Sequence, residues 1–125
     1  MQEFRSSIEA RDLDGLAALF SDDVVFRSPV VHAPYQGRDQ AMVLLTAVAQ
    51  VFEDFRYTRE IGAPGAADSA LVFRARVGDR EVEGCDFIHR NEEGLIDELF
   101  VMVRPLTGVL ALAEAMKQQL ESRKF

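Results

Sequence analysis

Asp86 is the residue of this sequence most able to do acid–base chemistry, because its surroundings predict a carboxylate on an apolar face. Residues 71–77 and 81–90 are expected strands, and the Gly78-Asp79 pair between them is typical of a two-residue hairpin turn. Burial among apolar side chains raises the pKa of a carboxyl group, which can then donate a hydrogen bond or transfer a proton to a carbonyl or hydroxyl ligand. The alternative is a structural carboxylate that binds a nearby backbone or side-chain group.

The register of this hairpin follows from its turn. It places opposite charges on one face and an apolar set with one carboxylate on the other: Arg76–Glu81 and Arg74–Glu83, then Ala75–Val82, Phe73–Gly84 and Leu71–Asp86. A shift by one residue would set arginines against valine and glycine, which supports this register. Residues 91–94 predict a second turn into a strand over 95–104, and a four-residue turn pairs Asp86 with Leu99, Ile88 with Asp97 and Cys85 with Phe100.

Ser28 and His32 are the next candidates for a functional site. Ser28 ends a predicted strand, where it can hydrogen-bond a ligand or position a water, or can simply terminate the strand. His32 lies in a loop near the expected pocket entrance, as a base at neutral pH or as an ordinary surface histidine. His89 is expected on the outer sheet face with Phe87. Neither histidine has metal-ligand spacing with another residue, so we expect no metal and no cofactor.

Apolar periodicity predicts the elements that position these residues. Helices are expected over about residues 2–11, 13–20 and 38–54 and after Pro105, and strands over 24–28 and 55–61 in addition to the three described above. Asp12 can cap the second helix and Thr107 the last. Residues 30–37 and 62–67 are expected loops. Helices first and strands last predict an α+β class, as a single domain over residues 1–125 with helices packed on one face of a curved antiparallel sheet.

Composition excludes several classes of function. The chain has 125 residues and a net charge of −7, which argues against binding to nucleic acid or to an anionic membrane. No apolar run reaches the length of a membrane span, and the start lacks a signal-peptide pattern. Cys85 is the single cysteine, so an internal disulfide is impossible. We therefore expect a soluble cytoplasmic protein.

Two segments of the sequence resemble a known family. The run from Asp12 to Phe26, followed by Ser28-Pro29 and Tyr35-Gln36-Gly37, resembles the opening of the nuclear-transport-factor-2-like superfamily, especially its ketosteroid-isomerase and SnoaL-type polyketide-cyclase branches. The run from Asp86 to Gly94 resembles its central strand and turn. The resemblance implies a cone-shaped curved antiparallel sheet wrapped by N-terminal helices, a cystatin-like roll, with a further C-terminal helix in this chain. It also implies an apolar pocket and dimerisation through the sheet.

The catalytic residues of ketosteroid isomerases carry over only in part. Ser28 stands where those enzymes have a general-base aspartate, and Phe4 stands where they have an oxyanion-binding tyrosine. Asp86 matches the aspartic acid of the central strand, which in those enzymes is kept neutral by an apolar site and donates a hydrogen bond. We therefore do not expect a standard ketosteroid isomerase, because a serine alone is a poor base.

These observations favour a homodimer, formed through the outer sheet face, that binds a small and mainly apolar molecule. If it is an enzyme, it is expected to be a cofactor-independent isomerase, cyclase or dehydratase, with Asp86 as acid or base and Ser28 and His32 orienting substrate or water. The alternative is a non-catalytic binding or dimerisation module. Tyr57 would offer a hydroxyl if its face is inward. The residues expected around the ligand are Phe4, Phe20, Phe26, Phe52, Tyr57, Phe73, Ile88, Leu99 and Val101.

Overall fold

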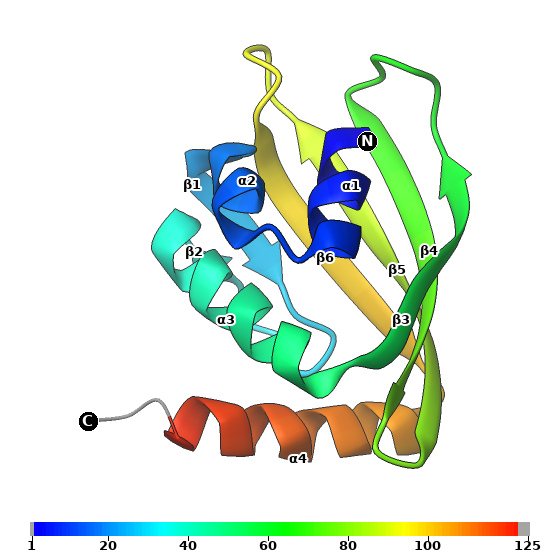
Figure 1. Ribbon diagram of the computed structural model, residues 1–125. Helices are drawn as coiled ribbons and strands as arrows, with labels where there is room; N and C mark the ends of the chain where they lie inside the picture. Colours follow the sequence, from blue (N-terminus) through cyan, green and yellow to red (C-terminus); the bar gives the residue numbers. More distant parts are fainter. Residues whose placement is uncertain (1, 123–125) are drawn as a thin grey trace.

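A six-stranded sheet and four helices make up the part of the chain that the computed structural model describes, residues 2–122 (Figure 1). In chain order the elements are α1 (Gln2–Ala10), α2 (Leu13–Ala18), β1 (Phe20–Arg27), β2 (Tyr35–Gln36), α3 (Arg38–Val51), β3 (Glu53–Ile61), β4 (Asp68–Val77), β5 (Arg80–Arg90), β6 (Ile96–Arg104) and α4 (Leu106–Ser122). Helices α1, α2 and α3 cover one face of the sheet, and α4 runs across one end of it (Figure 1).

The strand order is β2-β1-β6-β5-β4-β3. All neighbours are antiparallel except β1 and β6, which run parallel, with Phe26 opposite Leu99. Bulges interrupt the pairing of β1 with β6, of β3 with β4 and of β5 with β6. Because a bulge bends its strand and increases the local twist, these irregularities curve the sheet around the helices. The predicted α+β class with a curved sheet is confirmed.

The two predicted registers have different outcomes. All five pairs predicted for the β4–β5 hairpin are present. The predicted β5–β6 register is wrong by two residues, because Asp86 faces Val101, Ile88 faces Leu99 and Cys85 faces Met102. The connection leaves residues 91–95 unpaired, one more than predicted, and a bulge next to His89 adds the second residue. Beyond the bulge the shift is even, so Leu99 and Val101 keep their predicted faces and Asp86 still points to the helices, whereas Asp97 moves to the outer face.

Several element boundaries differ from the prediction for local reasons. The second helix ends at Ala18 because Phe20 pairs with Ile96 as the first residue of β1. The third helix ends at Val51, since Phe52 is extended. The predicted loop before it contains the short strand β2. Thr107 lies inside the first turn of α4 rather than at its cap. The predicted cap of α2 is confirmed, because the Gly15 backbone N–H donates to an Asp12 side-chain oxygen at 3.0 Å.

The core lies between the concave sheet face and the helices. Its most deeply buried side chains come from nearly every layer: Phe4, Leu16, Phe20, Val24, Leu71, Phe73, Ile88, Ile96 and Leu99. Gly84 on β5 permits close packing, because a Cβ at this position would overlap the Phe73 ring and lie 2.7 Å from the backbone oxygen of Met102. Among the described residues, no helix is long and apolar enough to cross a membrane.

Candidate functional site

A cavity of about 130 Å³ lies between the helices and the concave face of the sheet. Every helix and strands β1, β3, β4, β5 and β6 contribute to its wall. Most of the lining is apolar, and the innermost lining residues are almost fully buried: Phe4, Leu16, Tyr57, Phe73, Asp86, Leu99 and Leu112. Asp86 therefore supplies a carboxylate to the wall of an otherwise mainly apolar space.

Asp86 is held by Tyr57. The Tyr57 hydroxyl donates a hydrogen bond to Asp86 Oδ2 at 3.0 Å, and both side chains are buried. No hydrogen bond to the other carboxylate oxygen, Oδ1, is present among the described residues, and Asp86 lines the cavity. The two residues lie on β5 and β3, which are not neighbours in the sheet, so the curvature of the sheet brings them together. The pair thus leaves one oxygen of Asp86 available to a ligand.

Burial controls the titration of this pair. Desolvation raises the pKa of Asp86 to about 7, and the hydrogen bond from Tyr57 opposes this effect because it stabilises the ionised form. Burial also raises the pKa of Tyr57 far above its ordinary value, and the neighbouring Asp86 carboxylate adds to the rise. Tyr57 is therefore a permanent donor, whereas Asp86 is present in both protonated and ionised forms near neutral pH.

Aromatic rings pack against the ring of Tyr57. Phe55 contacts the Tyr57 ring edge-on at a centroid distance of 5.0 Å and stacks on Phe73 at 4.9 Å. Phe52 lies 5.5 Å from Phe73. On the side towards α1, the Arg5 guanidinium lies 5.8 Å from the centre of the Tyr57 ring. This cluster fixes the orientation of Tyr57 and gives the cavity a wall suited to a flat apolar group.

The structure places the other two predicted catalytic residues differently. Ser28 lines the cavity, and its Oγ accepts a hydrogen bond from the Val30 backbone N–H at 3.0 Å, which leaves its own O–H free to donate. His32 is exposed in the loop before β2 and does not line the cavity. The structure therefore brings Ser28 and Asp86 to the same space and leaves His32 outside it.

Seven of the nine residues expected around a ligand line the cavity: Phe4, Phe26, Phe52, Tyr57, Phe73, Leu99 and Val101. Phe20 and Ile88 do not, although both are buried. They lie towards the end of the sheet near residues 91–95, where Phe20 pairs with Ile96, and both belong to the packed hydrophobic core.

Further cavity-lining residues, which the sequence pattern did not single out, come mainly from helices and loops. Leu44, Leu45 and Val48 lie on the apolar face of α3, and Leu112 and Met116 come from α4. Helical spacing predicts an apolar face that includes Leu44, Leu45, Val48 and Met116 but not Leu112, and spacing alone does not show where a core is incompletely filled. Arg11, in the turn between α1 and α2, also lines the cavity, and no pattern in the sequence distinguishes it.

The outer sheet face carries a second polar pair. His89 Nδ1 and Asp97 Oδ1 lie 2.5 Å apart, and the bulge beside His89 brings Asp97 onto this face. The hydrogen bond to Asp97 is the main cause of a raised pKa for His89. Within residues 2–122, no three histidine, cysteine, aspartate or glutamate side chains form a group that could hold a metal ion.

Solved structures share this architecture at high similarity. A steroid delta-isomerase from Pseudomonas aeruginosa is 43% identical, with a TM-score of 0.91 over 97% of this chain and 88% of that one. A protein with a cystatin-like fold from Silicibacter pomeroyi is 34% identical, with a TM-score of 0.92 over 98% of this chain and 85% of that one. The epoxide hydrolase/cyclase-like enzyme SalBIII shares the fold at 16% identity, with a TM-score of 0.68 over 86% of this chain and 88% of that one.

Family membership rests on sequence as well as on structure. No curated protein matches the chain. The sequence pattern of the SnoaL-like domain family matches residues 1–99, which is more than half of the chain. The resemblance seen in the Asp12 to Phe26 segment and around Asp86 is thereby confirmed. The chain belongs to the SnoaL-like domain family, whose fold is shared by ketosteroid isomerase-like, polyketide cyclase and NTF2-like proteins.

Proposed function

We propose that the cavity binds a small, mainly apolar molecule bearing a carbonyl or hydroxyl group, and that Asp86 transfers a proton on it. The observation that carries this proposal is the Tyr57–Asp86 hydrogen bond at the wall of the apolar cavity. Tyr57 holds one oxygen of the carboxylate, and the other oxygen has no protein partner among the described residues. A positioned carboxylate whose pKa is about 7 can both accept and return a proton at neutral pH.

The proposed chemistry is proton abstraction next to a carbonyl group. Ionised Asp86 takes a proton from the adjacent carbon, and the electrons of the C–H bond move to the carbonyl oxygen to form an enolate. Neutral Asp86 then returns the proton to another atom of the same molecule. Ser28, whose O–H is free to donate, is a candidate partner for the enolate oxygen. Isomerisation, cyclisation and dehydration can all begin with this step.

The size of the cavity favours small substrates. A buried cavity of roughly 150 Å³ accommodates about one benzene ring, and the cavity here measures about 130 Å³. A four-ring steroid is larger than this space and would have to extend through its opening. The similarity to the steroid delta-isomerase from Pseudomonas aeruginosa supports the class of reaction, proton transfer beside a carbonyl, more than it supports a steroid as substrate.

No cofactor is needed for this reaction, because the proton and the electrons stay on the substrate and Asp86.

We also propose a cytoplasmic location. It is supported by the free thiol of Cys85, the single cysteine of the sequence, since proteins of oxidising compartments commonly carry disulfides.

Hydrogen–deuterium exchange tests the proposed reaction without knowledge of the product. Small aryl and alkyl ketones are incubated with the protein in D₂O, and deuterium gained beside the carbonyl is measured by NMR. We expect exchange with the native protein and none above background with Asp86→Asn, which keeps the shape of the side chain. Asp14→Asn changes an exposed carboxylate outside the cavity and is the matched control. Equal exchange by the native protein and Asp86→Asn would refute the role of Asp86.

The second candidate function is a non-catalytic binding module, favoured by the absence of an aspartate at position 28. In that case ketones raise the melting temperature of the native protein, but no exchange occurs. Calorimetric binding measured beside the exchange assay separates the two functions. Binding without exchange would select the module, and exchange that depends on Asp86 would select the enzyme.

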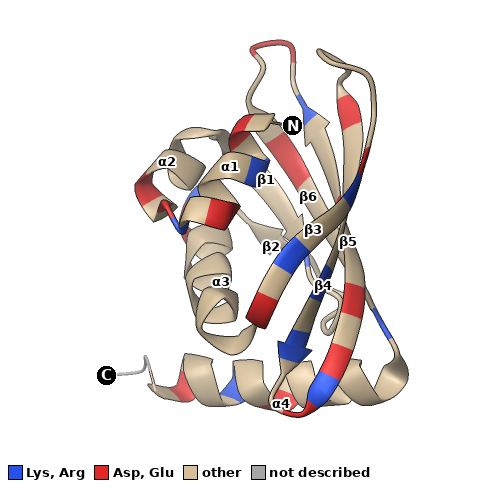
Figure 2. Ribbon diagram, turned by 45° about the vertical axis from the view of Figure 1, so that its right-hand side comes forward, with Lys and Arg blue, Asp and Glu red and all other residues tan. Residues whose placement is uncertain are grey.

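We further propose that a second copy of this chain covers the outer sheet face. Phe87 and Met102 are 41% and 49% exposed there, and Phe100 lies beside Phe87 with a ring distance of 6.2 Å. Paired charges flank these residues, including Glu83 with Arg104 at 3.2 Å, and Figure 2 shows acidic and basic bands interleaved along β3, β4 and β5. An apolar centre with a rim of both charge signs suits a self-complementary interface.

The oligomeric state tests this interface directly. Light scattering after gel filtration should give twice the chain mass for the native protein, and Phe87→Arg should shift it to the monomer mass. Arg59→Gln, an exposed change on β3, is the control. A native protein that stays monomeric at high concentration would contradict the proposal.

A further inference from the structure

The mouth of the cavity differs chemically from its interior. Among the lining residues, Arg11, Leu13 and Val30 are exposed, whereas Asp86 and Tyr57 are buried. The exposed residues therefore mark the end that opens to solvent. Because the cavity holds about one ring, any larger ligand must extend through this mouth. The chemistry of the mouth then selects what the outer part of the ligand carries.

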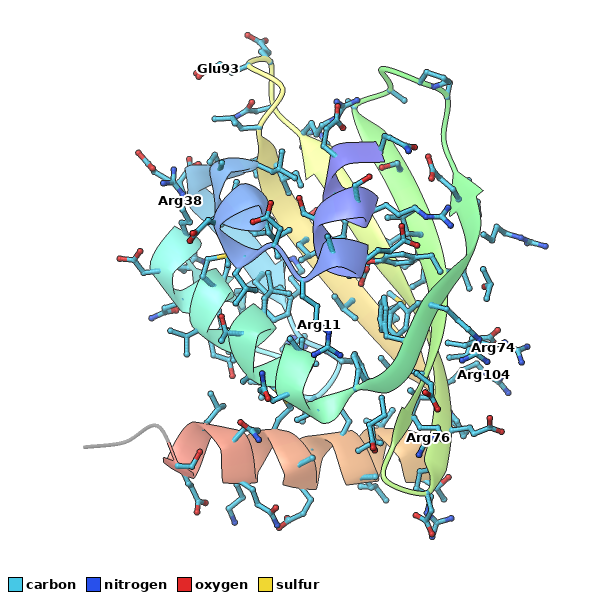
Figure 3. All side chains as sticks on the ribbon, in the orientation of Figure 1. Arg11, Arg38, Arg74, Arg76, Glu93 and Arg104 are labelled. Atoms are coloured by element: carbon cyan, nitrogen blue, oxygen red, sulfur yellow. The ribbon has the colours of Figure 1, made fainter. Side chains whose placement is uncertain are left out.

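Arg11 places a positive charge at this mouth. No carboxylate among the described residues forms an ion pair with it, whereas Arg5, Arg27 and Arg38 all have such partners. Within residues 2–122 its side chain makes one hydrogen bond, and this bond is long, from Nη1 to the backbone oxygen of Ala49 at 3.5 Å. Figure 3 shows Arg11 between the α1–α2 turn and the C-terminal part of α3, and Ala49 also lines the cavity.

The backbone at Arg11 is unusual for its residue type. Arg11 has φ 54°, in the left-handed region. Its N–H donates to the Ile8 oxygen at 3.1 Å and the Asp12 N–H donates to the Ser7 oxygen at 2.9 Å, the pattern of a Schellman motif at the end of α1. Glycine is the usual residue at this position because it lacks a Cβ. The left-handed conformation is less favourable for arginine than for glycine, so a turn with only a structural role would be more stable with glycine at this position.

We infer that Arg11 binds a carboxylate of the ligand at the cavity mouth. This inference rests on the proposed function, since it assigns the outer end of the molecule whose inner end meets Asp86. A guanidinium binds a carboxylate through two parallel N–H···O bonds, and the adjacent Leu13 and Val30 would contact an apolar chain that leads inwards. In a protein of net charge −7, an anionic ligand needs such a local cation. The substrate class is therefore an apolar keto or hydroxy acid.

Matched acids and esters test the inference. The probes are benzoylpropanoate and benzoylpentanoate with their methyl esters, and the dissociation constants are measured by calorimetry at low and high salt. The native protein should bind at least one acid about tenfold tighter than its ester, and the preference should weaken with salt. Arg11→Gln should weaken binding of that acid about tenfold and leave its ester unchanged. Arg59→Gln, which removes a positive charge outside the cavity, should leave both unchanged.

Arg11→Gly keeps the test decisive if glutamine disturbs the turn. Glycine suits the left-handed backbone, so this variant should fold at least as stably as the native protein while losing the preference for acids. Native protein that binds esters as tightly as acids would overturn the inference and leave the proposed function intact. Equal weakening of acid and ester by Arg11→Gln would show that Arg11 only supports the end of α3. Failure of all four probes to bind the native protein would overturn both proposals.

Discussion

Replacing Asp86 by asparagine should change how the stability of the protein depends on pH. In the unfolded chain the carboxyl group titrates near its ordinary pKa of 3.8, whereas burial raises its pKa to about 7 in the folded protein. Between these values the folded state holds a proton that the unfolded state has lost. The free energy of unfolding therefore falls as pH rises through this range, and this loss levels off above about pH 7.

The magnitude follows from the difference between the two pKa values. One pKa unit corresponds to about 1.4 kcal/mol, so the whole effect is roughly 4 kcal/mol. About 2–3 kcal/mol of it falls between about pH 5 and about pH 8. Asparagine has no such titration and can still accept the hydrogen bond from Tyr57. Relative to Asp86→Asn, the native protein should thus be less stable at pH 8 than at pH 5 by about 2–3 kcal/mol.

Urea unfolding at the two pH values measures this difference. Other groups whose pKa changes on folding, such as His89, are present in both proteins and cancel in the comparison. Asp14→Asn alters an exposed carboxylate outside the cavity and is the matched control. If native and Asp86→Asn stabilities differ by the same amount at both values, Asp86 titrates as an ordinary carboxyl group and the reasoning from burial fails.

Three further variants test individual contacts. Tyr57→Phe removes the hydrogen bond that lowers the pKa of Asp86, so a carbon NMR titration of that carboxyl should give a pKa above about 7. An unchanged pKa would mean that Tyr57 and Asp86 are not hydrogen-bonded in solution. Gly84→Ala should reduce the free energy of unfolding by about 1–3 kcal/mol in urea, because its Cβ overlaps the Phe73 ring; an unchanged midpoint would mean that the ring moves aside. Asp97→Asn should lower the pKa of His89, because the hydrogen bond to Asp97 is the main cause of its raised pKa, and NMR of the imidazole measures it. An unchanged pKa of His89 would mean that another group raises it.

Local chemistry explains which parts of the fold were predictable from sequence. The β4–β5 register was accessible because a two-residue turn and two opposite-charge pairs all select the same alignment. The β5–β6 register was not, since neither the five unpaired residues of the connection nor the bulge beside His89 leaves a distinct sequence signal. The predicted register was shifted by two residues, an even number, so Asp86 was still assigned to the correct face of the sheet.

The candidate site was predictable at its centre and not at its edges. Asp86 was evident as a carboxylate on an apolar face. Its partner Tyr57 was named only as a possible hydroxyl. Two bulges interrupt the pairing of β3 with β4, so the sheet face on which Tyr57 lies cannot be derived by counting residues along the strand. Arg11 was missed for a different reason: its side chain reaches the cavity from a turn, and turn residues follow no apolar period.

The parallel pairing of β1 with β6 has a consequence for how the protein folds. Phe26 and Leu99 are opposite each other in this pair and both line the cavity, although they are far apart in the chain. Contacts of such high sequence separation form late, because a long loop must close before they contribute. On the ribosome, the hairpin of β4 and β5 can form while β1 still lacks its neighbour. The cavity is thus a late product of folding, and a nascent chain that stops before β6 cannot enclose a ligand.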